Sequence, residues 1–273
     1  MNTQYHHYIT HSLGGLVMGA LSMTLQANER AETLTIMASS LPHADILEFA
    51  DDQLLNNLSL EIIEITGQMN PNGFLAGGDI DANFFQHVPY LETDSTNFSQ
   101  PLTVIATVHI EPLGIYSSRH DTLEALPKGA RIAVPDNPTN LSRALFLLED
   151  AELISLAPGV SRAELTQATE LDIAENPYEL EIVPIDAPLL MRALADVDAA
   201  IVNGNWVLEA GYTPDEDALV LETALDNPYA NILVTRQDIA HDERLVSLAN
   251  ALESEQVADF IREHYDGAVL PVH

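Results

Sequence analysis

The sequence predicts an α/β fold in which helices cover a largely parallel sheet. From residue 33 onward, short runs typical of strands alternate with longer runs whose apolar residues recur about every 3.6 positions. The chain has 273 residues, of which 47% are hydrophobic, so it can bury a sizeable core as one large domain or as two of ordinary size. Alternation, length and hydrophobicity together favour a folded globular protein.

The expected elements follow in order along the chain. Residues 33–39 (TLTIMAS) form the first strand, and residues 41–57 carry apolar side chains at helical spacing. Residues 60–66 (LEIIEIT) alternate as a second strand should. Later strands are expected at residues 78–83, 101–110, 130–135, 180–185, 198–204 and 231–236. Most of them precede a helical run, which is the order that places neighbouring strands parallel.

The chain is strongly acidic. It has 42 Asp and Glu residues against 10 Lys and Arg, a formal net charge of -32, so electrostatic repulsion opposes binding to nucleic acid or to anionic lipid. The acids are spread along the chain, which is typical of the solvated surface of salt-adapted proteins. Because such a surface repels itself, we expect the fold to be less stable at low ionic strength.

Residues 1–31 are predicted to be a signal peptide or leader. Residues 12–25 are apolar, small and uncharged, but too few to span a membrane comfortably, which fits the hydrophobic region of a signal peptide. Residues 1–11 lack Lys and Arg, and residues 25–27 match a cleavage signal only in part. A buried helix or a disordered leader is the alternative interpretation. The chain has no cysteine, which excludes disulfides, thiolate metal sites and cysteine nucleophiles.

Three polar clusters each follow an expected strand and open a helix. They span residues 79–87, 131–148 and 198–211. In open parallel sheets the carboxyl ends of the strands face the ligand crevice, so these clusters are candidates for a binding site. Helix capping is the competing explanation, for which the clusters offer Asn137, Thr139, Asn140, Asn203 and Asn205.

Arg143 lies in the first turn of the helix that is expected to begin near Thr139. The helix dipole mildly disfavours a cation there unless an anion is bound nearby. Two interpretations follow: an ion pair with a carboxylate of the protein, or a guanidinium that holds a ligand carboxylate in bidentate geometry. The position of Arg143 favours the second slightly.

Three histidines stand beside apolar or aromatic residues: His43, His87 and His109. With Glu111 they could form a zinc or manganese site, so a metal-ion receptor is one candidate function. None of the three has another histidine at helical i, i+4 spacing, and hydrogen-bonded structural histidines are the competing explanation. No G-x-S-x-G, Walker or G-x-G-x-x-G pattern follows a strand, so neither an enzyme nor a bound cofactor is predicted.

Seven stretches of the chain carry a family resemblance. They are LPHADILE, GDIDANFFQHVPYLE, HIEPLGIYS, RIAVPDNPTNLSRALFLL, DIAENP, LEIVPIDAPLLMRALADVDAAIVNGNWVLEAG and NPYANILVTR. In this order, from about residue 33 to residue 270, they resemble the NlpA/MetQ family of periplasmic methionine-binding proteins, the substrate-binding components of methionine ABC importers. The resemblance implies a periplasmic monomer that binds L-methionine or a close analogue and delivers it to an ABC permease with its ATPase, without catalysis.

The resemblance also implies a fold. Two α/β lobes of the periplasmic substrate-binding type would be joined by two crossover strands, with the ligand in the cleft between them. Lobe 1 would comprise residues 32–115 and 231–273, and lobe 2 residues 116–230. The implied ligand-binding residues are Phe85, His87, Tyr90, His109, Asn140, Arg143, Asn203 and Asn231.

The implied polar contacts suit an amino acid. Arg143, with Asn140 nearby, would hold the carboxylate, and Asn203 and Asn231 would bind the amino and carboxylate groups. An amino acid needs a guanidinium fork for its carboxylate, amide oxygens for its ammonium and polarizable aromatic faces for sulfur.

The implied apolar contacts come from one stretch and one histidine beyond it. Phe85, His87 and Tyr90 would wall the thioether from the start of a helix, after a turn, a short strand and a cap at residues 78–83. His109 would close the same side.

The sequence departs from the family pattern at two places. Gln68 stands where family members carry a tyrosine ahead of a Pro-Asn motif, so the aromatic trio named above is expected to carry more of the side-chain recognition. The lipobox cysteine of most relatives is absent. We expect either a soluble periplasmic protein released by ordinary signal peptidase or a leader that stays as an anchor.

Overall fold

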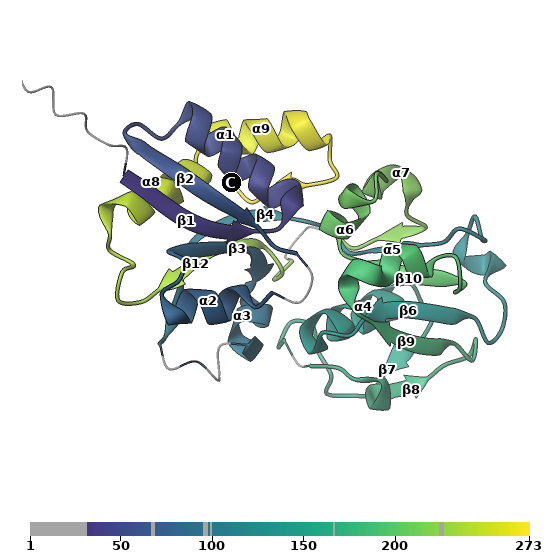
Figure 1. Ribbon diagram of the computed structural model, residues 1–273. Helices are drawn as coiled ribbons and strands as arrows, with labels where there is room; N and C mark the ends of the chain where they lie inside the picture. Colours follow the sequence, from purple (N-terminus) through teal and green to yellow (C-terminus); the bar gives the residue numbers. More distant parts are fainter. Residues whose placement is uncertain (1–31, 67–68, 95–97, 99, 166, 224–226) are drawn as a thin grey trace, which may run out of the picture. The chain divides into compact units, whose positions relative to one another are not determined.

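Two β-sheets, each flanked by helices, organise the described part of the chain (Figure 1). We call each sheet with its helices a lobe. The computed structural model describes residues 32–66, 69–94, 98, 100–165, 167–223 and 227–273. The predicted signal peptide at residues 1–31 and Gln68 lie outside these described residues.

The sheet of the first lobe has six strands. In spatial order they are β13 (Leu270–Pro271), β4 (Leu102–Ile110), β12 (Asn231–Arg236), β3 (Ala82–His87), β1 (Glu32–Ala38) and β2 (Leu58–Glu64). β1 pairs in parallel with both β2 and β3. β12 pairs antiparallel with both β3 and β4, and β13 is antiparallel to β4.

The sheet of the second lobe has five strands. In spatial order they are β11 (Val220–Leu221), β5 (Gly114–Tyr116), β10 (Ala199–Val202), β6 (Arg131–Pro135) and β9 (Glu181–Ile185). β6 is parallel to β10 and β9, whereas β5 is antiparallel to β10 and β11. An antiparallel pair outside this sheet joins β7 (Ser155–Leu156) to β8 (Ile173–Glu175).

Both sheets therefore mix parallel and antiparallel pairs, which corrects the expected, largely parallel arrangement. The alternation of strands and helices predicts the parallel pairs, because a helix carries the chain back to the same end of the sheet. The antiparallel strands β4, β5, β11 and β12 flank the two passages of the chain between the sheets. The first passage lies between Ile110 and Gly114, so the predicted lobe boundary at residue 115 falls inside β5.

Helices lie on both faces of each sheet. In the first lobe a short helical segment at Ser40–Ala44 leads into α1 (Asp45–Gln53), and the others are α2 (Pro71–Gly77), α3 (Val88–Asp94), α8 (Glu243–Leu252) and α9 (Glu255–Tyr265). The second lobe holds α4 (Pro138–Asp150), α5 (Leu190–Ala193), α6 (Gly204–Glu209) and α7 (Pro214–Asp217), with short 3-10 segments at Leu123–Ala125, Glu170–Asp172 and Ala187–Leu189.

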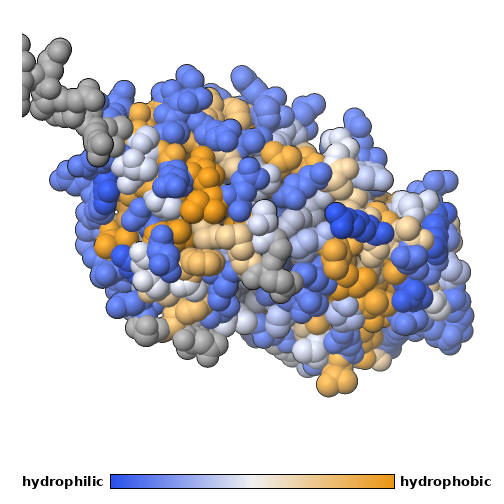
Figure 2. All heavy atoms as spheres, viewed as in Figure 1, coloured by the Kyte–Doolittle hydropathy of each residue, from blue (hydrophilic) through white to orange (hydrophobic). Residues whose placement is uncertain are grey.

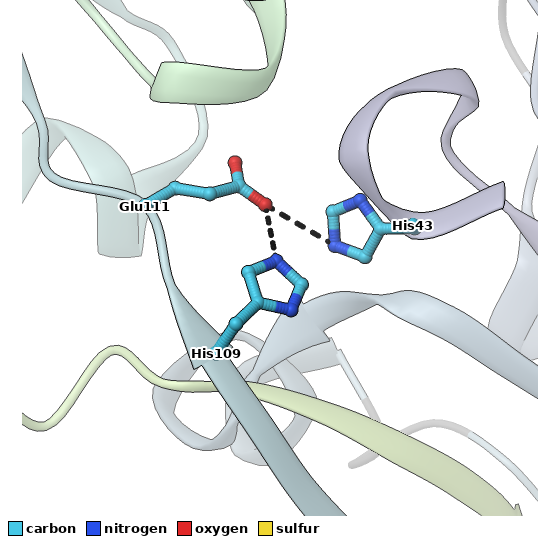
Figure 3. Close-up of side chains that lie close together, drawn as sticks. All are labelled: His43, His109 and Glu111. Atoms are coloured by element: carbon cyan, nitrogen blue, oxygen red, sulfur yellow. Dashed lines mark hydrogen bonds and ion pairs between the residues drawn. The ribbon is translucent and has the colours of Figure 1, made fainter. Parts of the chain in front are cut away.

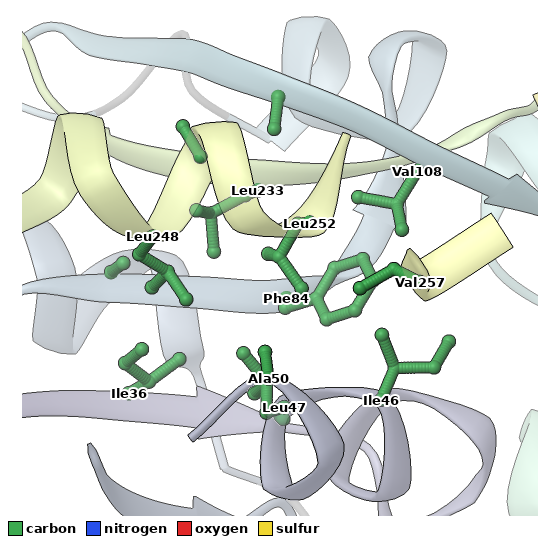
Figure 4. Close-up of a cluster of buried hydrophobic side chains, with 14 of the residues drawn as sticks. Ile36, Ile46, Leu47, Ala50, Phe84, Val108, Leu233, Leu248, Leu252 and Val257 are labelled. Atoms are coloured by element: carbon green, nitrogen blue, oxygen red, sulfur yellow. The ribbon is translucent and has the colours of Figure 1, made fainter. Parts of the chain in front are cut away.

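The main core of the first lobe lies between its sheet and helices α1, α8 and α9 (Figure 4). Phe84 of β3 is fully buried there with Leu47 of α1 and Leu252 of α8. Burying an apolar side chain of this size stabilises the folded state by about 1.5–3 kcal/mol. Met37 lies in a separate cluster with Leu75 of α2, so both faces of the sheet are covered.

Strand β3 extends beyond the expected strand at residues 78–83 and ends at His87. Phe85 and His87 therefore lie on a strand, not at the start of a helix, and α3 begins only at Val88. The reason is tertiary pairing: β3 is a central strand between β1 and β12, and Asn231 of β12 pairs with His87 at its end. Local sequence does not show this partner.

On the face shown in Figure 2, hydrophilic side chains cover much of both lobes, and apolar side chains appear between them. This distribution agrees with the acidic composition. Among the described residues, no helix is both long and apolar enough to cross a membrane.

Candidate ligand-binding site

A cavity of about 510 Å³ is lined by residues of both lobes. The first lobe contributes, among others, Ser39, Phe85, His87, Tyr90 and Asn231, and the second contributes Asp136, Asn140, Arg143, Asn203 and Trp206. Several of these residues stand at or just beyond the carboxyl ends of strands, such as Ser39 after β1 and Asn203 after β10. The structure thus brings all three of the polar clusters singled out in the sequence to one cavity.

Every residue implied to bind a ligand lines this cavity except His109. His109 is fully buried, and its ring meets those of Phe84 and His43 edge-on at centroid distances of 5.4 and 4.8 Å. Its Nε2 lies 2.8 Å from Oε1 of Glu111, which does line the cavity. His109 therefore stands behind Glu111 and acts on the cavity only through it.

An aromatic wall lies on the first-lobe side. The rings of Phe85 and Tyr90 meet edge-on at 5.5 Å, and the His87 ring packs against Tyr229 at 5.1 Å. Burial, and then the charge of Arg143, lower the pKa of His87 to about 4, so this ring is neutral near pH 7. The wall is therefore uncharged and polarizable.

Arg143 forms an ion pair with a carboxylate of the protein, which was one of its two interpretations from the sequence. Its Nε donates to both oxygens of Glu222, at 3.2 and 2.9 Å, and Nη2 donates to Glu222 and to the carbonyl oxygen of Glu111. Burial raises the pKa of Glu222, but the charge and hydrogen bonds of Arg143 outweigh it and hold that pKa below its usual value. Nη1 makes no hydrogen bond to a described residue.

The position of Arg143 also differs from the expected one. Helix α4 begins at Pro138, so Arg143 is its sixth residue and lies in the second turn. The argument from the helix dipole therefore loses weight, because the field is strongest in the first turn. The guanidinium is placed by Glu222 and by the Tyr229 ring, 4.6 Å from its central carbon.

Helix capping and the cavity use different asparagines. Asn137 caps α4, since its Oδ1 accepts from the backbone N–H groups of Thr139 and Asn140. Asn203 stands at the cap position of α6 but makes no capping bond. Its Oδ1 is buried without a partner among the described residues, while its Nδ2 donates to Asn140 at 3.4 Å. Asn203 is therefore free to serve the cavity.

Glu111 joins two histidines beneath the cavity (Figure 3). Its Oε1 lies 2.8 Å from Nε2 of His109 and 3.4 Å from Nε2 of His43. Burial lowers the pKa of His43 to about 4 and that of His109 to about 3, so both rings are neutral near pH 7. Burial also raises the pKa of Glu111.

The proposed three-histidine metal set is not assembled. Among the described residues, the group that could hold a metal ion is His43, His109 and Glu111, whose ligand atoms lie within 4.8 Å of one another. His87 is not part of this group. It is the last residue of β3, and its Nε2 donates instead to Asn140 of the second lobe.

Two informative residues of the cavity wall were not predicted to bind an organic ligand: Glu111 was considered only as a metal ligand, and Trp206 was not singled out. Both stand within four residues of a strand end, Glu111 after β4 and Trp206 after β10. The rule that ligand groups follow strand ends would have found Glu111, had it been applied to β4.

Two mixed α/β sheets, connected by two passages of the chain and enclosing a cavity lined by both, define a substrate-binding protein. This chain belongs to the NlpA lipoprotein family, whose family model matches residues 34–273. The family consists of substrate-binding proteins and not enzymes, in agreement with the prediction of no catalysis.

Individual relatives cover most of the chain. The methionine-binding lipoprotein MetQ of Bacillus subtilis (strain 168) is 35% identical over 260 residues, 94% of each chain. The D-methionine-binding lipoprotein MetQ of Escherichia coli (strain K12) is 34% identical over 215 residues, 78% of each chain. The structure of a nutrient binding protein from Burkholderia cenocepacia bound to methionine matches with a TM-score of 0.83 at 34% identity, over 88% of this chain and 100% of that one.

Proposed function

We propose that this chain is an extracytoplasmic solute-binding protein that captures L-methionine, or a close analogue, and delivers it to an ABC importer. A relative that matches 94% of the chain is named for methionine binding, another that matches 78% is named for D-methionine binding, and one similar structure was solved with methionine. The observation on this chain that carries the proposal is the make-up of its cavity. The lining combines the guanidinium of Arg143 with amides, among them Asn140, Asn203 and Asn231, and with the rings of Phe85, His87 and Tyr90.

The polar side suits the carboxylate of an amino acid. Nη1 of Arg143 is available as a donor, while Glu222 and Tyr229 fix the rest of the guanidinium. Oδ1 of Asn140 accepts from His87, which leaves the Nδ2 of Asn140 as a donor in the cavity that Arg143 also lines. Two donors at this place match the two oxygens of a ligand carboxylate.

The aromatic side suits a thioether. Phe85 and Tyr90 line the cavity, and a sulfur atom gains about 0.3–1.5 kcal/mol from a contact with such a ring. Met69 also lines this region and adapts its shape to an unbranched side chain. A linear sulfur-containing side chain is therefore the best match.

The route of the ligand is part of the proposal. The protein would act as a monomer in the periplasm, with residues 1–31 as its leader, and would pass its ligand to a membrane permease driven by an ATPase. Closure of the two lobes would enclose the ligand, and release would follow when the lobes separate.

Calorimetry with L-methionine tests the function. We expect one binding site per chain, with L-methionine preferred over D-methionine and over methionyl dipeptides. Trp206 offers a second readout, because it is the single tryptophan and lines the cavity. Absence of heat and of a fluorescence change with all of these ligands would reject methionine-type binding, and tighter binding of the D-isomer would reject the preference for L.

A further inference from the structure

Strand β3 has one extra residue relative to its neighbour β12. Phe84 and Gln86 pair with two consecutive residues of β12, so Phe85 between them has no partner on that strand. Such a β-bulge re-aims a side chain, and bulges are common beside binding sites. The bulged residue, Phe85, lines the cavity. The bulge therefore decides how this ring is presented to a ligand.

The bulge also changes the face of the sheet on which Gln86 lies. Successive residues of a regular strand alternate between faces, so Gln86 would share the face of Phe84, which belongs to the main core. Instead, Gln86 pairs with Ile232, whose side chain packs in the cluster on the other face, together with Leu75 of α2. Directly paired residues share a face. The side chain of Gln86 is therefore turned toward α2.

Three buried amides form a hydrogen-bond network on this face, and each is at most 2% exposed: Asn72 of α2, with Asn83 and Gln86 of β3. Oδ1 of Asn72 accepts from Nδ2 of Asn83 at 2.9 Å and from Nε2 of Gln86 at 2.7 Å. Nδ2 of Asn72 donates to Oε1 of Gln86 at 2.9 Å, and Nε2 of Gln86 also donates to Oδ1 of Asn83 at 2.9 Å. Asn83 and Gln86 stand on either side of the bulge, so the network fixes both of its ends.

Asn72 extends the network to α3. Its Nδ2 also donates to Oδ2 of Asp94 at 2.9 Å, and Asp94 ends the helix that carries Tyr90. One side chain thus ties α2 and α3 to the bulged strand, and these elements bring Pro71, Tyr90 and Phe85 to the cavity. Asn72 itself is fully buried and does not line the cavity.

A network of this kind is costly if it serves packing alone. Each buried amide must find partners for its donors and acceptors, whereas apolar side chains would pack α2 on the sheet without that requirement. What a satisfied network adds is rigidity and a single geometry. Here that geometry is the position of an aromatic wall.

We propose that Asn72 is a positioning residue, which acts through Asn83 and Gln86 to hold the bulge and to fix Phe85 against the side chain of the ligand. The network then sets how well the site distinguishes a thioether from a hydrocarbon chain of the same length. This inference rests on the proposed function, because it takes methionine as the ligand. Within that function it assigns side-chain selectivity to a residue that lies outside the cavity wall.

Comparison of L-methionine with L-norleucine, in which a methylene replaces the sulfur, provides the first test. A sulfur atom held against an aromatic ring improves affinity by about two- to tenfold, so we expect wild-type protein to prefer L-methionine by this factor in calorimetry. Phe85→Leu removes the ring and should make the two affinities about equal. Equal affinities in the wild type, or a preference that Phe85→Leu leaves intact, would overturn the proposal.

Asn72→Leu provides the second test, since it removes the centre of the network at similar side-chain volume and keeps Phe85. We expect the preference for L-methionine to fall to about that of Phe85→Leu. The matched control is Thr235→Val, because Thr235 is fully buried in the same lobe and donates from Oγ1 to the carbonyl oxygen of Asp81 at 2.6 Å. The control should lower the melting temperature but keep the wild-type preference, which separates loss of position from loss of stability.

Asn83→Leu decides the question if Asn72→Leu does not fold. It removes two of the hydrogen bonds and leaves those between Asn72 and Gln86, so it should fold and shift the preference in the same direction. Folded variants that keep the wild-type ratio of affinities, even if both ligands bind more weakly, would show that the network serves stability alone. That result would overturn this inference and leave the proposed function standing. If wild-type protein binds neither ligand, the proposed function fails, and this inference fails with it.

Discussion

His87 of β3 donates from Nε2 to Oδ1 of Asn140 in α4 at 3.0 Å, so one hydrogen bond joins the two lobes at the cavity. The tautomer is fixed, because the backbone N–H of Tyr90 donates to Nδ1 of His87 at 3.1 Å. The contact stands beside the groups proposed to hold the ligand carboxylate. It therefore couples closure of the lobes to the orientation of the Asn140 amide.

Replacing His87 by Phe should weaken L-methionine binding about fivefold, since an aromatic ring is kept but a hydrogen bond worth roughly 1 kcal/mol is lost. Titration followed by Trp206 fluorescence measures this. The same change at His241, which is exposed, should leave affinity unaltered. Equal affinities for His87→Phe and wild type would show that the contact does not assist binding.

The Arg143–Glu222 pair should contribute to stability as well as to the site. Glu222→Gln leaves the Arg143 charge buried and uncompensated, so we expect the free energy of unfolding to fall by about 3 kcal/mol. Urea unfolding gives this value. The matched control is Glu179→Gln, which removes the partner of Lys128 in a pair whose side chains are about two-thirds exposed, and it should be nearly neutral. Similar losses of unfolding free energy in the two variants would refute the distinction between the buried and the exposed ion pair.

The same pair shows where prediction from the sequence stops. Periodicity finds the helix that carries Arg143, but Glu222 lies 79 positions away and no local pattern links the two. The strand-end rule gathered the polar clusters of the cavity, because parallel strands place their carboxyl ends together. It failed for Phe85 and His87, whose strand persists through pairing with β12. Burial also decides the histidine chemistry, since His43 reaches Glu111 only in the folded chain.

Asn137 and Asn203 separate helix capping from ligand binding. Asn137→Ala removes the cap of α4 and should cost about 1 kcal/mol of stability. Asn203→Ala removes no capping bond and should leave stability nearly unchanged, yet weaken L-methionine at least about tenfold because its buried Oδ1 is an acceptor in the cavity wall. Thermal unfolding and calorimetry on both variants check this. If Asn137→Ala weakens binding and Asn203→Ala lowers stability instead, the two roles are assigned to the wrong residues.

Stability should fall as the pH drops from 6.5 toward 4. The pKa values of His43 and His87 are about 4 and that of His109 about 3, against an ordinary value of 6.5, because burial penalises the charged ring. The unfolded chain therefore takes up these protons first, and each histidine lowers the free energy of unfolding by up to about 1.4 kcal/mol per pH unit within this window. The raised pKa of Glu111 acts in the opposite direction and offsets part of the loss.

Urea unfolding at pH 7 and pH 5 tests the histidine contribution. His43→Gln removes one titrating ring. It should reduce the slope of the free energy of unfolding against pH by up to about 1.4 kcal/mol per pH unit, the slope that one proton contributes. His241→Gln, at an exposed position, should leave the slope as in wild type. If the slope is the same in His43→Gln and wild type, the buried ring does not titrate as its environment requires.

The acidic surface should make stability depend on salt. With 42 acidic against 10 basic residues, like charges repel across the folded surface, and added salt screens them over a distance of about 8–10 Å near physiological ionic strength. We expect the melting temperature to rise steadily as sodium chloride is added, and potassium chloride to act alike because the effect is screening and not specific binding. Differential scanning calorimetry over a salt series measures this. A melting temperature that is indifferent to salt would mean that the charges are too well solvated or too evenly spaced to oppose folding.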